Sequence, residues 1–173
     1  MTPKKAAISL SALKLFSTEG YRSTSTKKIA ENAGVSEALI FRHFGNKKGL
    51  LNSLIHKIEE RFISSISLIV AEKDPKKVIE KTIIEAFNSM QIEPEYWNLN
   101  YQLKKELKGD LFWRMDLIFT ILLKEFKNLN VDEPEYEAKF LVLFLEGMGS
   151  ELHNKTLKNT TELLSFVMKK YKL

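Results

Sequence analysis

The chain lacks cysteine entirely, and it also lacks long hydrophobic runs. Without cysteine, a disulfide scaffold, a zinc site built on thiolates and a cysteine nucleophile are excluded. The longest unbroken apolar stretch has six residues, from Phe140 to Leu145, whereas a membrane-spanning helix needs about 20. A signal peptide is not expected either, because Lys14 interrupts the N-terminal apolar stretch. These absences predict a cytoplasmic protein.

Glycine and proline are scarce, with seven and four of the 173 residues. Apolar residues recur at helical spacing along most of the chain, whereas the alternation typical of strands is rare. Asp132 and Glu135 form the pattern of a capping box beside Pro134, which predicts that a helix begins there. The predicted fold class is therefore all-α, with about nine helices.

The positive charge is concentrated in the first third of the chain. Residues 1–57 hold ten Lys and Arg against three Glu, whereas residues 58–173 hold 17 basic and 19 acidic side chains. A compact basic segment beside a nearly neutral remainder indicates that the first segment binds a polyanion. The alternative is a basic, solvated surface that has no partner.

The stretch from Thr24 to Leu51 carries the most specific pattern in the chain. It predicts two short helices joined by a tight turn, in which Gly34 permits a positive φ and Ser36 caps the second helix. This is the pattern of a helix-turn-helix, whose second helix presents its N-terminal residues to the major groove of DNA. Lys47 begins the following helix, where free backbone amides and the helix dipole favour a phosphate.

The same stretch resembles the N-terminal signature of the TetR family of bacterial transcriptional regulators, over about residues 8–55. The matching residues are Leu15, Phe16, Gly20, Tyr21, Thr24, Ser25, Ile29, Ala30, Ala33, Gly34, Val35, Ser36, Phe41, Phe44, Lys47, Leu50 and Leu51. The family usually has tyrosine in place of Phe41, and phenylalanine can pack there but cannot donate to a phosphate. The resemblance implies a helix-turn-helix DNA-binding domain over residues 1–48. It also implies a helical ligand-binding and dimerisation domain over residues 49–173.

Double-stranded DNA is the predicted partner of the first domain. Thr26 begins the first motif helix and is expected, with its two neighbouring lysines, to contact phosphates; Lys47 is expected to do the same. Arg42 can read guanine or hold a phosphate, and Leu39 can touch a thymine methyl. Glu37 can accept from a cytosine amino group, or it can simply favour the positive end of its helix. The predicted DNA-binding residues are Thr26, Lys27, Lys28, Ser36, Glu37, Ala38, Leu39, Phe41, Arg42, His43, Lys47 and Lys48.

The eighth expected helix is apolar nearly all round between Ala138 and Leu145. A helix that is apolar on every side is buried on every side, which favours a second chain against it. Pairing of the last two helices is also what the resemblance implies, and a monomeric core helix is the alternative. The predicted dimer-interface residues are Leu141, Phe144, Leu145, Met148, Leu152, Leu163, Phe166 and Val167.

The middle helices are rich in large side chains. The resemblance implies that the body encloses a pocket for a small-molecule effector, and aromatic walls suit a hydrophobic or aromatic ligand. The alternative is that these residues are ordinary core and surface aromatics. The predicted ligand-binding residues are Phe87, Met90, Tyr96, Trp97, Tyr101, Trp113, Met115 and Phe119.

Together these features predict a ligand-responsive, DNA-binding transcriptional regulator that is not an enzyme. The resemblance implies a repressor that binds a palindromic operator as a homodimer and is released by a small effector. No cofactor or metal is expected, because His43, His56 and His153 show no spacing that would form a metal site. The alternative function is a ligand- or partner-binding helical protein whose helix-turn-helix is only a scaffold.

Overall fold

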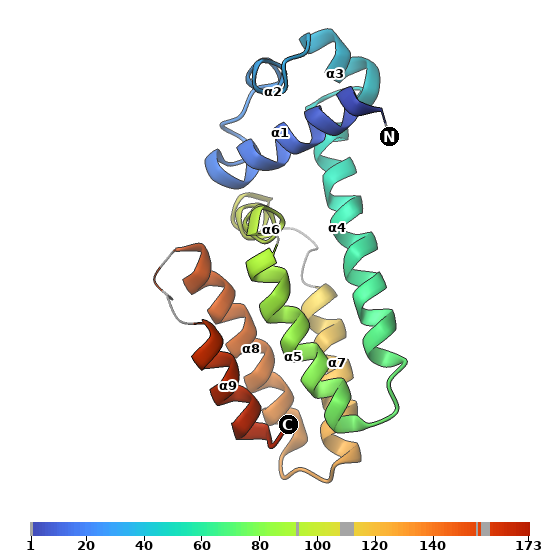
Figure 1. The fold of residues 1–173 in the computed structure, drawn as a ribbon, viewed down its shortest axis with the longest axis vertical. Coiled ribbons are helices and arrows are strands. Elements are labelled where there is room, and N and C mark those ends of the chain that lie inside the picture. Colours follow the sequence, from blue (N-terminus) through green and yellow to red (C-terminus); the bar gives the residue numbers. More distant parts are fainter. Residues whose placement is uncertain (1, 93, 108–112, 155, 157–159) are drawn as a thin grey trace. The chain divides into compact units, whose positions relative to one another are not determined.

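The computed structural model describes the backbone of residues 2–92, 94–107, 113–154, 156 and 160–173. The side chains of residues 92, 104–107, 113 and 153 are outside the description. All regular structure in the described part is helical (Figure 1). The helices are α1 Pro3–Glu19, α2 Thr26–Ala33, α3 Glu37–Phe44, α4 Lys47–Val70, α5 Pro75–Ile92, α6 Pro94–Leu107, α7 Trp113–Asn128, α8 Pro134–His153 and α9 Thr160–Tyr171. The prediction of an all-α chain with about nine helices is confirmed.

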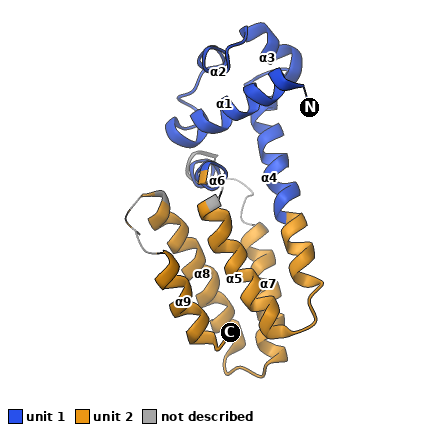
Figure 2. Ribbon diagram, in the orientation of Figure 1, with its two compact units in different colours: residues 1–62, 95–109 blue, residues 63–94, 110–173 orange. Residues whose placement is uncertain are grey.

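The helices form two compact units, coloured separately in Figure 2. The head unit comprises Met1–Phe62 and Glu95–Gly109, so it contains α1 to α3, the first part of α4 and α6. The body unit comprises Ile63–Pro94 and Asp110–Leu173. The division by packing thus falls inside α4, later than the functional division predicted after residue 48, which stays a prediction.

Glycines and hydroxyl caps end and begin the short helices of the head. Gly20 ends α1 with φ 89°, and the buried Thr24 hydroxyl donates to the Gly20 carbonyl at 2.8 Å, which closes the following loop. Ser25 caps α2 by accepting from the Lys28 amide at 3.1 Å. Gly34 ends α2 in the left-handed region with φ 64°, as the turn pattern predicts.

The core of the head lies between α1, α2, α3 and the start of α4. Its fully buried side chains are Ile8, Ala12, Phe16, Ile29, Ile40 and Leu50. The buried Ser11 hydroxyl donates to the Ile29 carbonyl at 3.0 Å and thereby ties α1 to the middle of α2. This packing fixes the orientation of α3, because Ile40 anchors one of its sides and leaves the opposite side exposed.

In the body, α5 packs against α7, α8 and α9, and α7 also packs along α8. Fully buried side chains at this centre are Ile79, Ile83, Phe87, Leu122, Phe126, Ala138 and Leu141. The Tyr171 hydroxyl donates to the Glu137 carboxylate at 3.0 Å and joins α9 to α8. Burial, and after it this hydrogen bond, raises the pKa of Tyr171, so the phenol keeps its proton.

The start of α8 differs from the expected capping box. Pro134 is the first helical residue, but Glu133 occupies the N-cap position with φ 50° and makes no side-chain cap hydrogen bond. A capping side chain reaches the first amides from an extended N-cap residue, and a left-handed backbone does not provide that geometry. The helix start was therefore predicted correctly, and the capping box of Asp132 and Glu135 was wrong.

Candidate DNA-binding surface

The exposed side of α3 is the centre of the candidate surface. Ala38, Phe41 and Arg42 are exposed and lie on one side of the helix, because residues three and four positions apart share a helical face. Phe41 keeps 45% of its surface accessible, which is a high value for an aromatic ring. Ser36, also exposed, precedes the helix and makes no side-chain cap hydrogen bond, contrary to the expected cap. We call these four residues the α3 surface.

The remaining residues predicted on α3 are less exposed. Leu39 and His43 are half-buried, and the His43 ring lies 6.2 Å from that of Phe44 in an edge-on arrangement. Glu37, the first residue of α3, accepts a 2.6 Å hydrogen bond from the Thr26 hydroxyl. Thr26 therefore joins the first residues of the two motif helices instead of pointing freely to solvent.

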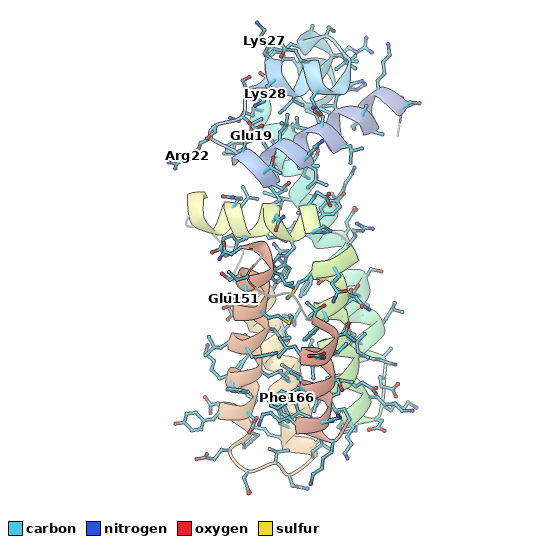
Figure 3. The ribbon with its side chains drawn as sticks, turned by 60° about the vertical axis from the view of Figure 1, so that its left-hand side comes forward. Glu19, Arg22, Lys27, Lys28, Glu151 and Phe166 are labelled. Carbon is cyan, nitrogen blue, oxygen red and sulfur yellow. The ribbon has the colours of Figure 1, made fainter. Side chains whose placement is uncertain are left out.

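Basic side chains on α2 and α4 flank the α3 surface, and they differ in whether they are held by an ion pair. Lys27 is exposed, whereas the Lys28 ammonium pairs with Glu19 at 2.6 Å (Figure 3). Lys48 is exposed on the first turn of α4. An exposed ion pair of this kind contributes little to stability, so Lys28 can exchange Glu19 for a phosphate at small cost.

Lys47 is half-buried at the start of α4, over the loop between α1 and α2. Its ammonium lies 4.4 Å from the centre of the Tyr21 ring and 3.4 Å from the Arg22 carbonyl oxygen. The cation–π contact holds the charge beside the helix start, where the dipole also favours an anion. Asn46 caps the helix by accepting from the Gly49 amide at 2.8 Å.

Sequence reasoning missed two residues of this surface, Arg22 and Lys4, and one residue that supports it, Gly49. Arg22 is exposed beside Lys47, and its signal was a basic residue directly after the Gly-Tyr pair of the motif. Lys4 lines, together with Arg42, a depression of about 500 Å³ at the turn between α2 and α3. Gly49 is required by close packing, because a Cβ there would overlap with the Phe44 carbonyl oxygen.

The residues predicted to bind an effector lie in both units. Phe87 and Met90 are buried in the body, and Met115 and Phe119 are half-buried on α7. Tyr96, Trp97 and Tyr101 are half-buried on the part of α6 that belongs to the head unit. The side chain of Trp113 lies outside the description. Within the head unit, Arg61 stands 5.3 Å above the Tyr96 ring, and the Trp97 indole N–H is buried with no hydrogen-bond partner among the described residues.

The residues predicted at the dimer interface divide by burial. Leu141, Leu145, Met148 and Val167 are buried within their own chain. Phe144, Leu152 and Leu163 are half-buried, and Phe166 is 65% exposed. These buried side chains pack inside the body, so they cannot contact a second chain directly and can affect an interface only through the exposed residues beside them.

Large apolar side chains are exposed on both α8 and α9, and only part of this set was anticipated. Phe140 and Leu143 are 52% and 55% exposed and share a stripe of α8 with Tyr136 and Gly147. The Lys170 ammonium lies 5.4 Å from the Phe140 ring, and Phe166 sits one turn before Lys170 on α9 (Figure 3). We call Tyr136, Phe140, Leu143 and Phe166 the α8–α9 face.

The described residues form neither a membrane-spanning helix nor a metal cluster. No helix in that part of the chain is long and apolar enough to cross a membrane. Among the same residues, no group of three or more His, Asp or Glu side chains could hold a metal ion.

Known proteins place the chain in a family. Residues 8–54 match the profile of the bacterial regulatory proteins, tetR family. The HTH-type transcriptional regulator YvkB of Bacillus subtilis is 51% identical over 55 residues, which are 32% of this chain and only 29% of that protein. The nucleoid occlusion factor SlmA of Photorhabdus laumondii is 34% identical over 149 residues, covering 79% of this chain and 75% of SlmA.

The fold of the whole chain has solved counterparts. A TetR-like transcriptional regulator from Rhodococcus sp. RHA1 superimposes with a TM-score of 0.81 and 16% identity, covering 97% of this chain and 92% of that one. The sequence signature in the head, the SlmA match along three quarters of its length and the shared fold agree. The chain belongs to the TetR family of bacterial transcriptional regulators.

Proposed function

We propose that the protein is a homodimeric repressor that binds a near-palindromic DNA operator in the bacterial cytoplasm and is released by a small hydrophobic or aromatic effector. The observation that carries the proposal is the α3 surface. Ala38, Phe41 and Arg42 lie on one side of α3 and are exposed, and Ile40 anchors the opposite side of the helix in the head core. This is the arrangement by which a recognition helix enters a major groove.

Contacts to bases and to phosphates come from different parts of the head. The Arg42 guanidinium can donate two parallel hydrogen bonds to guanine, whereas the Phe41 ring can contact thymine methyl groups. Lys27, Lys48 and Arg22 surround the α3 surface with exposed positive charge. These side chains set the register on the phosphate backbone without reading sequence.

A dimer through the α8–α9 face supports the two-fold symmetry that a palindrome requires. Phe140, Leu143 and Phe166 expose large apolar surfaces to solvent in the single chain, and covering them removes that surface from water. A two-fold interface uses the same face of both chains. Two heads related in this way meet half-sites separated by one or more helical turns, each of about 34–36 Å.

Release by an effector needs a route from the body to the head. α4 is one uninterrupted helix whose residues belong to the head unit up to Phe62 and to the body unit from Ile63. We nominate it as the lever, with a coupling free energy of about 1–3 kcal/mol between effector and DNA.

Fluorescence anisotropy tests the DNA-binding step. The purified protein is titrated against duplex fragments from its own upstream region at about 50 and 200 mM salt, over which a DNA-binding protein loses several powers of ten in affinity. Saturable, salt-steep binding of two protomers to one fragment is expected. Binding that is weak on every genomic fragment and insensitive to salt would instead favour a partner-binding scaffold.

A nucleoid occlusion role is a second candidate function, favoured by the 34% identity to SlmA of Photorhabdus laumondii over 75% of its length. The two candidates differ in how many chromosomal sites the protein occupies. Chromatin immunoprecipitation with sequencing should show one or a few operators for a local repressor. A spread of many sites around the chromosome, with cell-division defects on overproduction, would favour the second candidate.

A further inference from the structure

The first residues of α2 and α3 are joined by a side-chain hydrogen bond. The Thr26 hydroxyl donates to Oε1 of Glu37 at 2.6 Å, a length typical of a hydroxyl bound to a charged carboxylate. The helix cap of α2 does not need this hydroxyl, because Ser25 accepts from the Lys28 amide. The bond therefore constrains the Glu37 carboxylate and not the end of its own helix.

Lys28, which lies on the same helix as Thr26, does not neutralise the Glu37 carboxylate. Lys28 pairs with Glu19, at 2.6 Å, and Thr26 is the hydrogen-bond partner of Glu37 within the described part of the chain. Glu37 thus carries an oriented negative charge at the start of the recognition helix, next to the exposed Ser36 and Ala38. Thr26 bonds to Oε1 of this half-buried side chain, so the other oxygen, Oε2, is the one that a donor on DNA would use.

We propose that Thr26 is a positioning residue that aims the Glu37 carboxylate at the exocyclic amine of a cytosine in each operator half-site. The inference rests on the proposed DNA-binding function and identifies cytosine as the base that Glu37 recognises. An ionised carboxylate only accepts hydrogen bonds. In the major groove the donors are the amines of cytosine and adenine, and the adenine amine stands beside the N7 acceptor, which repels a carboxylate. Cytosine has no such acceptor on its edge.

An acidic side chain at this position increases discrimination more than affinity. Near the phosphates of a wrong sequence, Glu37 is repelled and gains no hydrogen bond, whereas the amine of a correctly placed cytosine offsets the repulsion. Thr26 raises the effect because a held carboxylate loses less side-chain freedom on binding than a mobile one does. The pair therefore acts on one base position and leaves the remaining contacts unchanged.

Selection from a pool of duplexes with a randomised centre tests the inference on the whole protein. Wild type is compared with Glu37→Gln, Thr26→Val, Thr26→Ser and the matched control Thr18→Val, whose hydroxyl donates to the Lys14 carbonyl on exposed α1 surface. Wild type should enrich a near-palindrome with cytosine fixed at one position of each half-site. Glu37→Gln should change that base to adenine, because glutamine pairs with adenine through one donor and one acceptor.

The Thr26 variants separate positioning from a phosphate contact. Thr26→Val should lower the preference for cytosine at that position about fivefold or more, with other positions unchanged. Thr26→Ser, which keeps the hydroxyl, should stay within about twofold of wild type, as should Thr18→Val. A role in phosphate binding would instead weaken binding to all sequences equally.

Each remaining outcome overturns a defined part of the inference. If Glu37→Gln enriches the same sequences as wild type, Glu37 reads no base and the inference fails, while the proposed function stands. If Glu37→Gln changes the base but Thr26→Val behaves as wild type, the positioning role fails. If wild type enriches no sequence at all, the proposed function itself fails and the inference with it.

Discussion

In the head unit, α1, α2 and α3 meet at turns where the backbone itself is constrained, whereas the helices of the body unit are joined through buried side chains. Gly20 and Gly34 end α1 and α2 with positive φ, and Gly49 lets α4 start against the last turn of α3. In the body, α5 instead buries Ile83 and Phe87 against its neighbours. The orientation of α3 thus depends on backbone turns with positive φ and on one glycine, Gly49, where a side chain does not fit, so the two units should respond differently to the same substitution.

The largest expected effect comes from placing alanine at one glycine of each unit. Gly49→Ala should lower the free energy of unfolding by about 3 kcal/mol, because the added Cβ overlaps with the Phe44 carbonyl oxygen and the backbone must shift. Gly147→Ala, in a helix with nothing within 4 Å of the added Cβ, should raise it by up to about 1 kcal/mol through helix propensity. Urea denaturation followed by circular dichroism measures both values. Equal effects at the two sites would remove the contrast between the units.

A charge on the α8–α9 face tests the body at its surface. Phe166→Asp should weaken dimerisation by about 2 kcal/mol or more, since it puts a carboxylate in place of a ring that is 65% exposed in the single chain. The matched control is Leu68→Asp, which adds the same charge at a residue of α4 that is 73% exposed. Sedimentation velocity over a range of concentrations should show monomers for the first variant only. Dissociation by both variants, or by neither, would contradict an interface at this face.

Much of the head could be predicted because its signals are local. Gly34 between two short helices is a short-range pattern, and the structure ends α2 at Gly34 with a positive φ as that pattern predicts. The cap expected from Ser36 is the part of the pattern that does not form, because Ser36 makes no side-chain cap hydrogen bond. The bond between Thr26 and Glu37 could not be anticipated, since it depends on how two helices pack and not on either helix alone. The close approach that requires Gly49 is a tertiary contact of the same kind.

The body was harder to predict because its pattern carries less directional information. All six residues from Phe140 to Leu145 are apolar, so helical periodicity cannot show which of them face inward. The structure buries Leu141 and Leu145, both predicted at the interface, and exposes Phe140 and Leu143, which were not. The neighbouring helices determine which face of a helix is buried, and the sequence of that helix alone does not show where its neighbours lie.

A moderate effect is expected at the α3 surface of the head. Arg42→Ala should weaken binding to the selected operator about tenfold or more and relax the base preference at one position, because a bidentate contact with guanine is lost. Unfolding should be unchanged, since Arg42 is exposed. Lys14→Ala removes one charge from an exposed position of α1 and serves as the control for net charge. Anisotropy at matched salt measures both, and an equal loss for the two variants would leave Arg42 with a phosphate contact only.

The smallest effect is expected at the corner between α4 and α5, which is the loop that follows α4. In the head, a glycine ends α1 and another ends α2. In the body, the carboxylate of Glu72 holds this loop instead. The Lys81 ammonium, followed by the Asp74 and Lys73 amides, lowers the pKa of Glu72 from 4.5 to about 2. Lys81 lies 2.8 Å from one carboxylate oxygen, and the two amides lie 3.2 and 2.8 Å from the other. A depressed pKa in the folded state means that the carboxylate contributes stability above about pH 4.5 and loses it as the pH falls towards 2.

Glu72→Gln should therefore be slightly less stable than wild type at pH 7, and the difference should shrink between about pH 4.5 and pH 2, where wild type becomes protonated. Thermal unfolding at a series of pH values measures the difference directly. Lys81→Gln removes the main cause of the shift, so adding Glu72→Gln to it should change the pH profile much less than adding it to wild type. A constant difference between Glu72→Gln and wild type down to pH 2 would mean that the carboxylate acts through shape alone. The backbone would then hold the loop between α4 and α5, as it holds the turns of the head. The contrast between backbone constraint in the head and side-chain contacts in the body would not apply to this loop.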